Sequence, residues 1–242
     1  VDYINTGEFR SYEDLREQLI EKMLGEKPAE TRRKIERIVQ GWEDLRVEKE
    51  AKSRGLLAYY DKNHIPRVVE EILTNWEEQS QNKHFNAILT VAYKKRVIAY
   101  YEEFKKQQEK LDKKINIVMT FSFGSDEEGE AIAPEIIKMM FEDYAEFTQV
   151  NFSKEDNKLD DADYFEDIVA RLSRGGSGRN PKNIDLVIVA DRLLTGYDSK
   201  YLNTLYIDRE LKLQSLIQAY SRTNRIYGKS KEFGSVVNFQ YP

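Results

Sequence analysis

The most constraining feature of this sequence is a set of short, continuous apolar segments in its second part, separated by longer amphipathic stretches. Runs of about four to eight apolar residues are typical of strands buried on both faces. Strands that alternate with helices predict an α/β fold, in which a parallel sheet of five to six strands carries helices on both faces. We predict strands at 85–91, 115–121, 184–190, 202–207 and 235–239, with a possible short strand at 150–152, and helices at 94–110, 131–147, 163–174 and 210–226.

The first part of the chain has a different rhythm. Apolar residues recur at helical spacing within 11–24, 31–53 and 64–79, where most of the other positions are charged or polar. The polar segment SQNK at 80–83 follows as a connector. We therefore predict a charged helical connector region at 1–80 and a separate α/β domain at 81–242.

The composition limits the classes of site and partner. The chain has 242 residues and no cysteine, which excludes disulfides and thiolate zinc sites and fits a reducing cytoplasm. With only two histidines, we expect no metal site. No apolar run approaches the roughly 18 to 20 residues that span a bilayer, so no membrane partner is expected. A net charge of −5 means that any contact with nucleic acid must come from a local patch. The first residue is not Met, so we expect a fragment of a longer protein.

In a parallel α/β sheet, ligands bind beyond the carboxyl ends of the strands. The loop after the run 184–190 is too short to hold a full helix before the next strand, which predicts a tight polar elbow. It contains Thr195, Gly196 and Asp198, and the glycine would let the backbone approach a ligand closely. The alternative is an ordinary turn in which Asp198 caps the next short helix. By this rule, the loops expected to carry a site follow Val91, Phe121, Ala190, Ile207 and Phe239.

The segment LIQAYSRTNR at 216–225 places Gln218, Arg222 and Arg225 within about 60° of one another on a helix. Arginine suits phosphate because its planar guanidinium makes paired hydrogen bonds with the oxygens. The alternative is a helix on the surface whose arginines pair with some of the many acidic side chains. A second stripe, about 140° away, is expected to pack on the sheet; it consists of Leu213, Leu216, Ile217 and Tyr220.

TGYD at 195–198 followed by QAYSRTNR at 218–225 resembles motifs V and VI of superfamily 2 helicases and translocases. The longer segment 193–226 resembles the restriction (motor) subunit of type I restriction–modification enzymes, and 85–104 and 116–122 resemble the first two strands of that subunit's second RecA-like domain. The resemblance covers roughly residues 64 to 240. It implies a RecA-like fold for this part of the chain.

The resemblance also implies roles for single residues. Arg222 and Arg225 stand where the family's arginine fingers contact ATP, and Gln218 stands beside them on the γ-phosphate side. Gly196 and Asp198 stand at motif V, which couples the nucleotide state to DNA, and are expected near ATP. Thr195 of the same motif is expected at the DNA. Near motif IV, the residues expected at the DNA backbone are Thr120 and Ser122.

Several parts of such a motor are missing from the sequence. No GxxxxGK[ST] phosphate cradle occurs, and the acidic GSDEEGE at 124–130 would repel a triphosphate. The ExK pairs at 50–52 and 210–212 are interpreted as surface charges, so no nuclease centre is expected. RGGSGRNP at 174–181 is read as a flexible loop, with a contact to DNA phosphates as the alternative. We therefore expect ATP and Mg²⁺ to act in the full-length subunit and neither to bind this fragment alone, which should be inactive.

The leading interpretation is thus the second motor domain of a DNA-translocating restriction subunit. Its expected partners are the first RecA-like domain of the same chain, double-stranded DNA, and the methyltransferase and specificity subunits. Two alternatives stay open: a non-catalytic interaction domain whose charged N-terminal helices dock a partner, and a motor domain of another superfamily 2 translocase.

Overall fold

The structure is a computed structural model, in which two compact units are formed by Asn5–Val68 and by Val69–Pro242 together with Val1–Ile4. The functional division near residue 80 stays a prediction. The structure describes residues 2–3, 12–25, 28, 31–56, 62–122, 132–150, 152, 161–174, 182–190, 192–193, 196–211 and 213–240. Among these residues, no helix is long and apolar enough to cross a membrane.

Three complete helices lie among the described residues of the smaller unit: α1 (Tyr12–Leu24), α2 (Arg32–Gln40) and α3 (Asp44–Ser53). The single helix predicted over 31–53 is wrong, because Glu43 adopts an extended conformation and divides that segment after Gly41. Ile38 of the predicted apolar stripe is 51% exposed. The buried apolar residues of this unit include Leu15, Leu19, Ile20, Ile35, Val39, Val47 and Ala51.

Two helices, α4 (His64–Thr74) and α5 (Trp76–Gln79), replace the single helix expected over 64–79. The break lies at Asn75, whose side-chain amide donates to the carbonyl of Glu71 at 3.0 Å. A side chain that bonds to the preceding turn competes with the regular helix. The chain then turns through three successive left-handed residues at 81–83 before it enters the sheet.

The sheet has six strands in the order β1-β6-β5-β2-β4-β3, and these strands pair in parallel. The predicted α/β class, a RecA-like parallel sheet of five to six strands, is confirmed. The strand β1 was not predicted, because two residues carry no periodicity. Val150 and Phe152 lie outside any strand. The strands are β1 (Asp2–Tyr3), β2 (Asn86–Val91), β3 (Ile117–Thr120), β4 (Leu186–Val189), β5 (Leu202–Asp208) and β6 (Ser235–Asn238).

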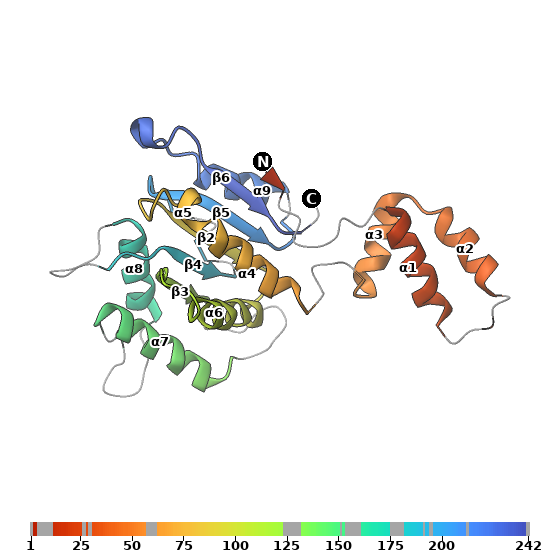
Figure 1. Ribbon diagram of the computed structural model, residues 1–242, viewed down its shortest axis with the longest axis horizontal. Coiled ribbons are helices and arrows are strands. Elements are labelled where there is room, and N and C mark those ends of the chain that lie inside the picture. The colour runs from red at the N-terminus through yellow and green to blue at the C-terminus, as the bar shows by residue number, and fades with distance from the viewer. Residues whose placement is uncertain are drawn as a thin grey trace. The chain divides into compact units, whose positions relative to one another are not determined.

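The connections put helices on both faces of this sheet (Figure 1). The step from β2 to β3 crosses the sheet in one direction, and the steps from β3 to β4 and from β5 to β6 cross it in the other. Since such crossovers are right-handed, α6 lies on one face and α7, α8 and α9 lie on the opposite face. These helices are α6 (Lys94–Gln108), α7 (Pro134–Thr148), α8 (Asp161–Leu172) and α9 (Leu213–Arg222).

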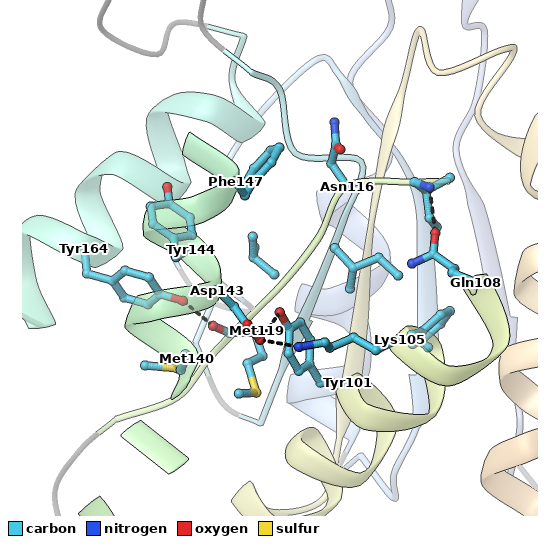
Figure 2. Close-up of a pocket in the computed structure, with 14 residues that line it drawn as sticks. Tyr101, Lys105, Gln108, Asn116, Met119, Met140, Asp143, Tyr144, Phe147 and Tyr164 are labelled. Atoms are coloured by element: carbon cyan, nitrogen blue, oxygen red, sulfur yellow. Dashed lines mark hydrogen bonds and ion pairs between the residues drawn. The ribbon is translucent and has the colours of Figure 1, made fainter. Parts of the chain in front are cut away.

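The core lies under the central strands, since every residue of β2, β4 and β5 is buried. At the β3 edge, a cavity of about 180 Å³ opens between α6, α7 and α8 (Figure 2). The Tyr164 hydroxyl donates to the Met119 carbonyl at 2.6 Å beside this cavity, and Asp143 accepts from Tyr101 and Lys105. The strand order separates β3 from β6, so this cavity is remote from the segment that follows α9.

Candidate functional site

The elbow between β4 and β5 is confirmed as a connection without a helix in its described residues, 192–193 and 196–201. Gly196 has a φ of +78°, and a Cβ built on it would meet no atom within 4 Å. The glycine is therefore required by the left-handed backbone and not by crowding. It directly precedes the buried Tyr197 and the exposed Asp198. Thr195 lies outside the described residues.

The direction of α9 decides where the arginines lie. This helix starts beyond the carboxyl end of β5 and runs back along the sheet, so its last residue, Arg222, lies toward the amino ends of the strands. The next residue, Thr223, touches Gly234, which stands directly before β6. The expectation that the site would lie in the loops at the carboxyl ends is therefore wrong for these arginines.

Both arginines reach the elbow. Arg222 donates from Nη1 to the carbonyl of Tyr197 at 3.1 Å, and Arg225 forms an ion pair with Asp198. The Arg225 and Asp198 side chains remain 60% and 41% exposed. The structure thus brings together segments that are 25 to 27 residues apart in the chain. Two guanidinium groups converge here beside a glycine turn.

Gln218 is exposed one turn before Arg222, on the same helix. The neighbouring Ile217 is 62% exposed, which corrects the expectation that it belongs to the stripe packed on the sheet. Tyr220 of that stripe is half-buried. The outward face of α9 thus carries an apolar residue next to the polar residues predicted to face a nucleotide.

Two of the residues predicted at DNA, Thr120 and Ser122, lie at the other end of the strands. Thr120, the last residue of β3, is fully buried, and its hydroxyl accepts a hydrogen bond from Arg192 at 3.2 Å. Arg192 also donates to Asp161 at 2.8 Å. Ser122, two residues beyond Thr120, is exposed. The DNA contacts of Thr120 and Ser122 stay predictions.

A buried ion pair at the carboxyl end of β5 was missed. Asp208 is fully buried and accepts from Arg96 Nη2 at 2.7 Å and from the Tyr100 hydroxyl at 2.6 Å. Burial, and then the Asp208 charge, raise the pKa of Tyr100 well above its ordinary value. Burial is the largest single influence on the pKa of Arg96 and lowers it, but the Asp208 and Tyr100 charges and the hydrogen bond to Asp208 together outweigh burial, so the net shift is upward. The only sequence signal was an aspartate directly after an apolar run.

The donor set determines what the site can hold. Two guanidiniums and an exposed amide fit the oxygens of a phosphate group. No group of three or more metal-ligating side chains occurs among the residues that the structure describes. The side chains gathered here therefore fit a phosphate group, whereas a metal ion would need ligands from elsewhere.

Comparison with known proteins identifies the family of the chain. The family model described as "Type I restriction enzyme subunit R domain 3" matches residues 83–241. The SauCOLORF180P endonuclease subunit of a type I restriction enzyme from Staphylococcus aureus (strain COL) is 36% identical over 181 residues, or 73% of this chain. The SsaAORF53P endonuclease subunit from Staphylococcus saprophyticus is 34% identical over 182 residues. The match spans 19% of the length of each of these relatives.

Among solved structures, domain 2 of the DEAD-box helicase Mss116p, bound to an RNA duplex, aligns over 74% of this chain and 50% of that chain. The identity is 16% and the TM-score is 0.39. The fold class rests on the strand pairings and the family on the sequence match. The family model covers more than half of the sequence, including both arginines. The chain belongs to the family of the type I restriction enzyme subunit R domain 3.

Proposed function

We propose that this chain is the second motor domain of the ATP-dependent, DNA-translocating restriction subunit of a type I restriction enzyme. The observation that carries the proposal is the convergence of Arg222 and Arg225 on the Tyr197–Asp198 elbow. Both arginines are held at the end of one helix, and one of them stays largely exposed. In the longer subunit, a neighbouring domain would supply the phosphate cradle that this sequence lacks.

Bound ATP would supply the phosphoryl group whose transfer to water releases the energy for movement, together with Mg²⁺ held by the neighbouring domain. This chain's part is electrostatic. Arg222 is positioned by its bond to the Tyr197 carbonyl, and Arg225 exchanges Asp198 for phosphate oxygens when the two domains close. Gln218, one turn earlier in the helix, helps to orient the γ-phosphate. An arginine that stabilises charge on a transferred phosphoryl group contributes roughly 10³ to 10⁵ in rate.

The elbow also connects the arginines to the strand ends. It runs from the carboxyl end of β4 to the amino end of β5. When Arg225 is released, Asp198 would therefore move and displace the elbow, which includes Thr195. The elbow begins at the carboxyl ends of the strands, where Thr120 and Ser122 are proposed to contact duplex DNA. The methyltransferase and specificity subunits are proposed as the partners that direct the motor to its DNA.

The test uses the full-length subunit that contains this domain. Arg222→Ala and Arg225→Ala should each lower the rates of ATP hydrolysis and DNA translocation by at least about 10³. Arg225→Ala in the 242-residue chain should leave its thermal unfolding nearly unchanged, because the ion pair of Arg225 with Asp198 is exposed. Wild-type rates in either variant would refute the finger assignment.

A non-catalytic interaction domain is the second candidate, and the separate three-helix unit is the observation that favours it. That unit would dock a partner subunit without any role for the arginines. Deletion of residues 5–68 from the full-length subunit separates the two candidates. Loss of complex assembly with normal ATP hydrolysis would favour docking, and normal assembly would favour the motor role alone.

A further inference from the structure

A cationic and aromatic cluster lies at the amino ends of β2 and β5, on residues to which the proposed function gives no role. We define the amino-edge cluster as His84, Arg174, Lys200, Tyr201 and Tyr227. His84 and Lys200 are exposed, and the other three side chains are half-buried. The positions come from four separate segments, so the tertiary fold alone brings them together.

The rings form one continuous surface. The centroids of Tyr201 and Tyr227 are 5.4 Å apart, and the His84 ring lies 5.5 Å from Tyr227. The Lys200 ammonium lies 4.9 Å from the centroid of Tyr227 and 5.4 Å from that of Tyr201. Lys200 is exposed and can swing away from the ring faces. Aromatic faces flanked by cations are the arrangement with which proteins bind nucleobases and their phosphates.

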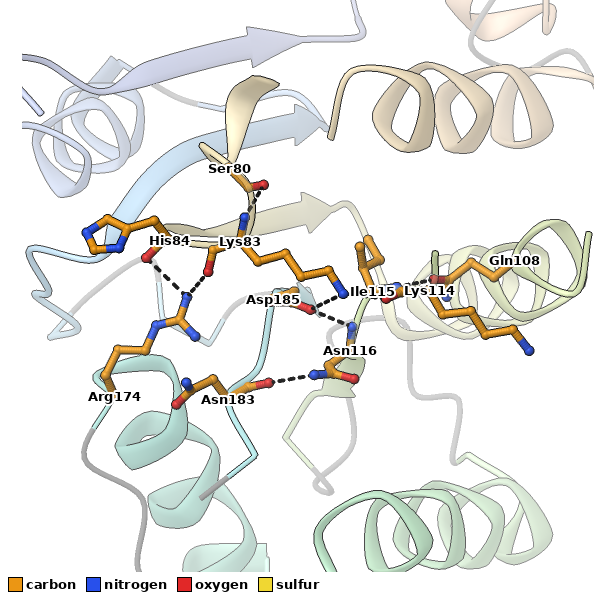
Figure 3. Close-up of polar contacts among 10 residues, drawn as sticks. All are labelled: Ser80, Lys83, His84, Gln108, Lys114, Ile115, Asn116, Arg174, Asn183 and Asp185. Carbon is orange, nitrogen blue, oxygen red and sulfur yellow. Dashed lines mark hydrogen bonds and ion pairs between the residues drawn. The ribbon is translucent and has the colours of Figure 1, made fainter. Parts of the chain in front are cut away.

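Arg174 supplies the second cation. Its Nη2 donates to the carbonyls of Lys83 at 2.9 Å and His84 at 3.2 Å (Figure 3). Its guanidinium lies 5.8 Å from the Tyr201 ring centroid. Among the described residues, no carboxylate makes an ion pair with it. The adjoining segment 175–181 contains no acidic side chain. A half-buried guanidinium whose hydrogen bonds to the described residues go to carbonyl groups favours an anion as a further partner.

The electrostatics agree with that geometry. Burial lowers the pKa of Arg174, and the carboxylate of Asp185 only partly offsets the effect. Asp185 is itself turned inward, where it accepts the Asn116 N–H at 2.8 Å and lies 3.7 Å from the Lys83 ammonium (Figure 3). The positive charge of Arg174 is therefore only partly compensated beside the Tyr201 ring.

The backbone beneath the cluster is strained. Gln81, Asn82 and Lys83 have φ values of 47°, 56° and 65°, and none of them is glycine. Such conformations cost free energy and persist where the surrounding structure enforces them, often at binding sites. Here the turn presents the Lys83 and His84 carbonyls to Arg174. It thereby fixes the guanidinium beside the rings.

We propose that the amino-edge cluster binds a nucleotide unit, with the base against Tyr201 and Tyr227 and the phosphate at Arg174 and Lys200. The chemistry rests on the cluster alone. The choice of a single DNA strand as the source of that unit rests on the proposed motor function. The site would hold a DNA strand at the amino ends of the β-strands, whereas Thr120 and Ser122 are proposed to contact DNA at the carboxyl ends.

The test measures binding of the 242-residue chain to a fluorescent oligothymidylate of about 12 nucleotides and to an abasic strand of equal length. The thymidylate should bind at least about fivefold more tightly, because only it can stack on the rings. Tyr201→Ala and Tyr227→Ala should remove that difference, whereas Tyr201→Phe and Tyr227→Phe should keep it. Equal binding of the two strands, or an unchanged difference in the alanine variants, would overturn the proposal.

The phosphate contact has its own readout. Lys200→Gln should make the plot of log K against log salt shallower by about 0.7, the value for one phosphate contact on a single strand. Lys138→Gln is the matched control, since Lys138 is an exposed lysine on α7. An unchanged slope in Lys200→Gln would contradict the phosphate role.

Competition with ATP identifies the source of the nucleotide. If ATP leaves the labelled strand bound, the strand is the ligand; displacement would keep the nucleotide site but overturn DNA as its source. Arg222→Ala should not change strand binding. If the chain binds no thymidylate while Arg222→Ala still abolishes ATP hydrolysis in the full-length subunit, this inference fails and the proposed function stands.

Discussion

Arg225 and Asp198 form an ion pair that joins the end of α9 to the elbow after β4, across 27 residues of sequence. The pair neutralises the arginine that is proposed to meet a phosphate. Because both side chains are largely exposed, water screens their attraction and the pair costs little to break. Asp198 therefore positions Arg225 near the elbow without holding it against a stronger anion.

Asp198→Asn should change the free energy of unfolding of the chain by less than about 1 kcal/mol, since exposed ion pairs contribute little. Urea unfolding followed by circular dichroism measures the change. In the full-length subunit, the same variant should have a modest effect on ATP hydrolysis compared with Arg225→Ala. A loss of more than about 2 kcal/mol would mean that the pair is structural.

Asp208→Asn should destabilise the chain by about 3 kcal/mol or more, because it leaves the Arg96 guanidinium buried without its carboxylate. The matched control is Glu142→Gln, which removes an exposed pair with Lys138 and should cost less than about 1 kcal/mol. Urea unfolding of both variants supplies the comparison. Similar losses of unfolding free energy in the two variants would show that the buried ion pair of Asp208 with Arg96 is not important for stability.

Gly234→Ala should destabilise the chain by about 1 to 3 kcal/mol through overpacking. A Cβ at this position would lie 2.2 Å from the Thr223 Cβ and 2.3 Å from the Thr223 carbonyl oxygen, so the backbone after α9 must shift. Thr223 lies between the two arginines, so ATP hydrolysis by the full-length subunit should fall as well. Thermal unfolding and ATP hydrolysis measured side by side test both effects; an unchanged unfolding temperature would contradict the contact.

Lys231 provides a test that depends on pH. Burial lowers its pKa to about 8, and its ammonium donates to the Leu202 carbonyl at 2.5 Å. The unfolded chain binds the proton more tightly, so stability should rise with pH between about 8 and the ordinary lysine value of 10.5. Lys231→Met removes this dependence, so the difference in unfolding free energy between the two proteins should move in favour of the wild type from about pH 7 to about pH 10. Urea unfolding at both pH values measures this difference; a difference that is constant with pH would argue against the shift.

Much of the fold could be predicted from the sequence because its strands are buried on both faces. A continuous apolar run such as IDLVIVA needs no partner to be recognised, and the helices between the runs imply parallel pairing. The helix breaks at Glu43 and Asn75 were missed, because apolar periodicity continues through them. The exposure of Ile217 was missed for a related reason, since periodicity marks the spacing of a stripe but not which helix face meets the sheet.

The sequence by itself determined where the main strands lie and which two arginines are the candidate site residues. It also determined the family, through the segments around TGYD and QAYSRTNR. Only the tertiary structure decided that α9 carries Arg222 and Arg225 back to the amino ends of the strands, where they meet the elbow. The same holds for Asp208 with Arg96, and for the amino-edge cluster. Local residue patterns fix the path of each segment, whereas contacts between distant segments depend on crossover direction and strand order, which no local pattern encodes.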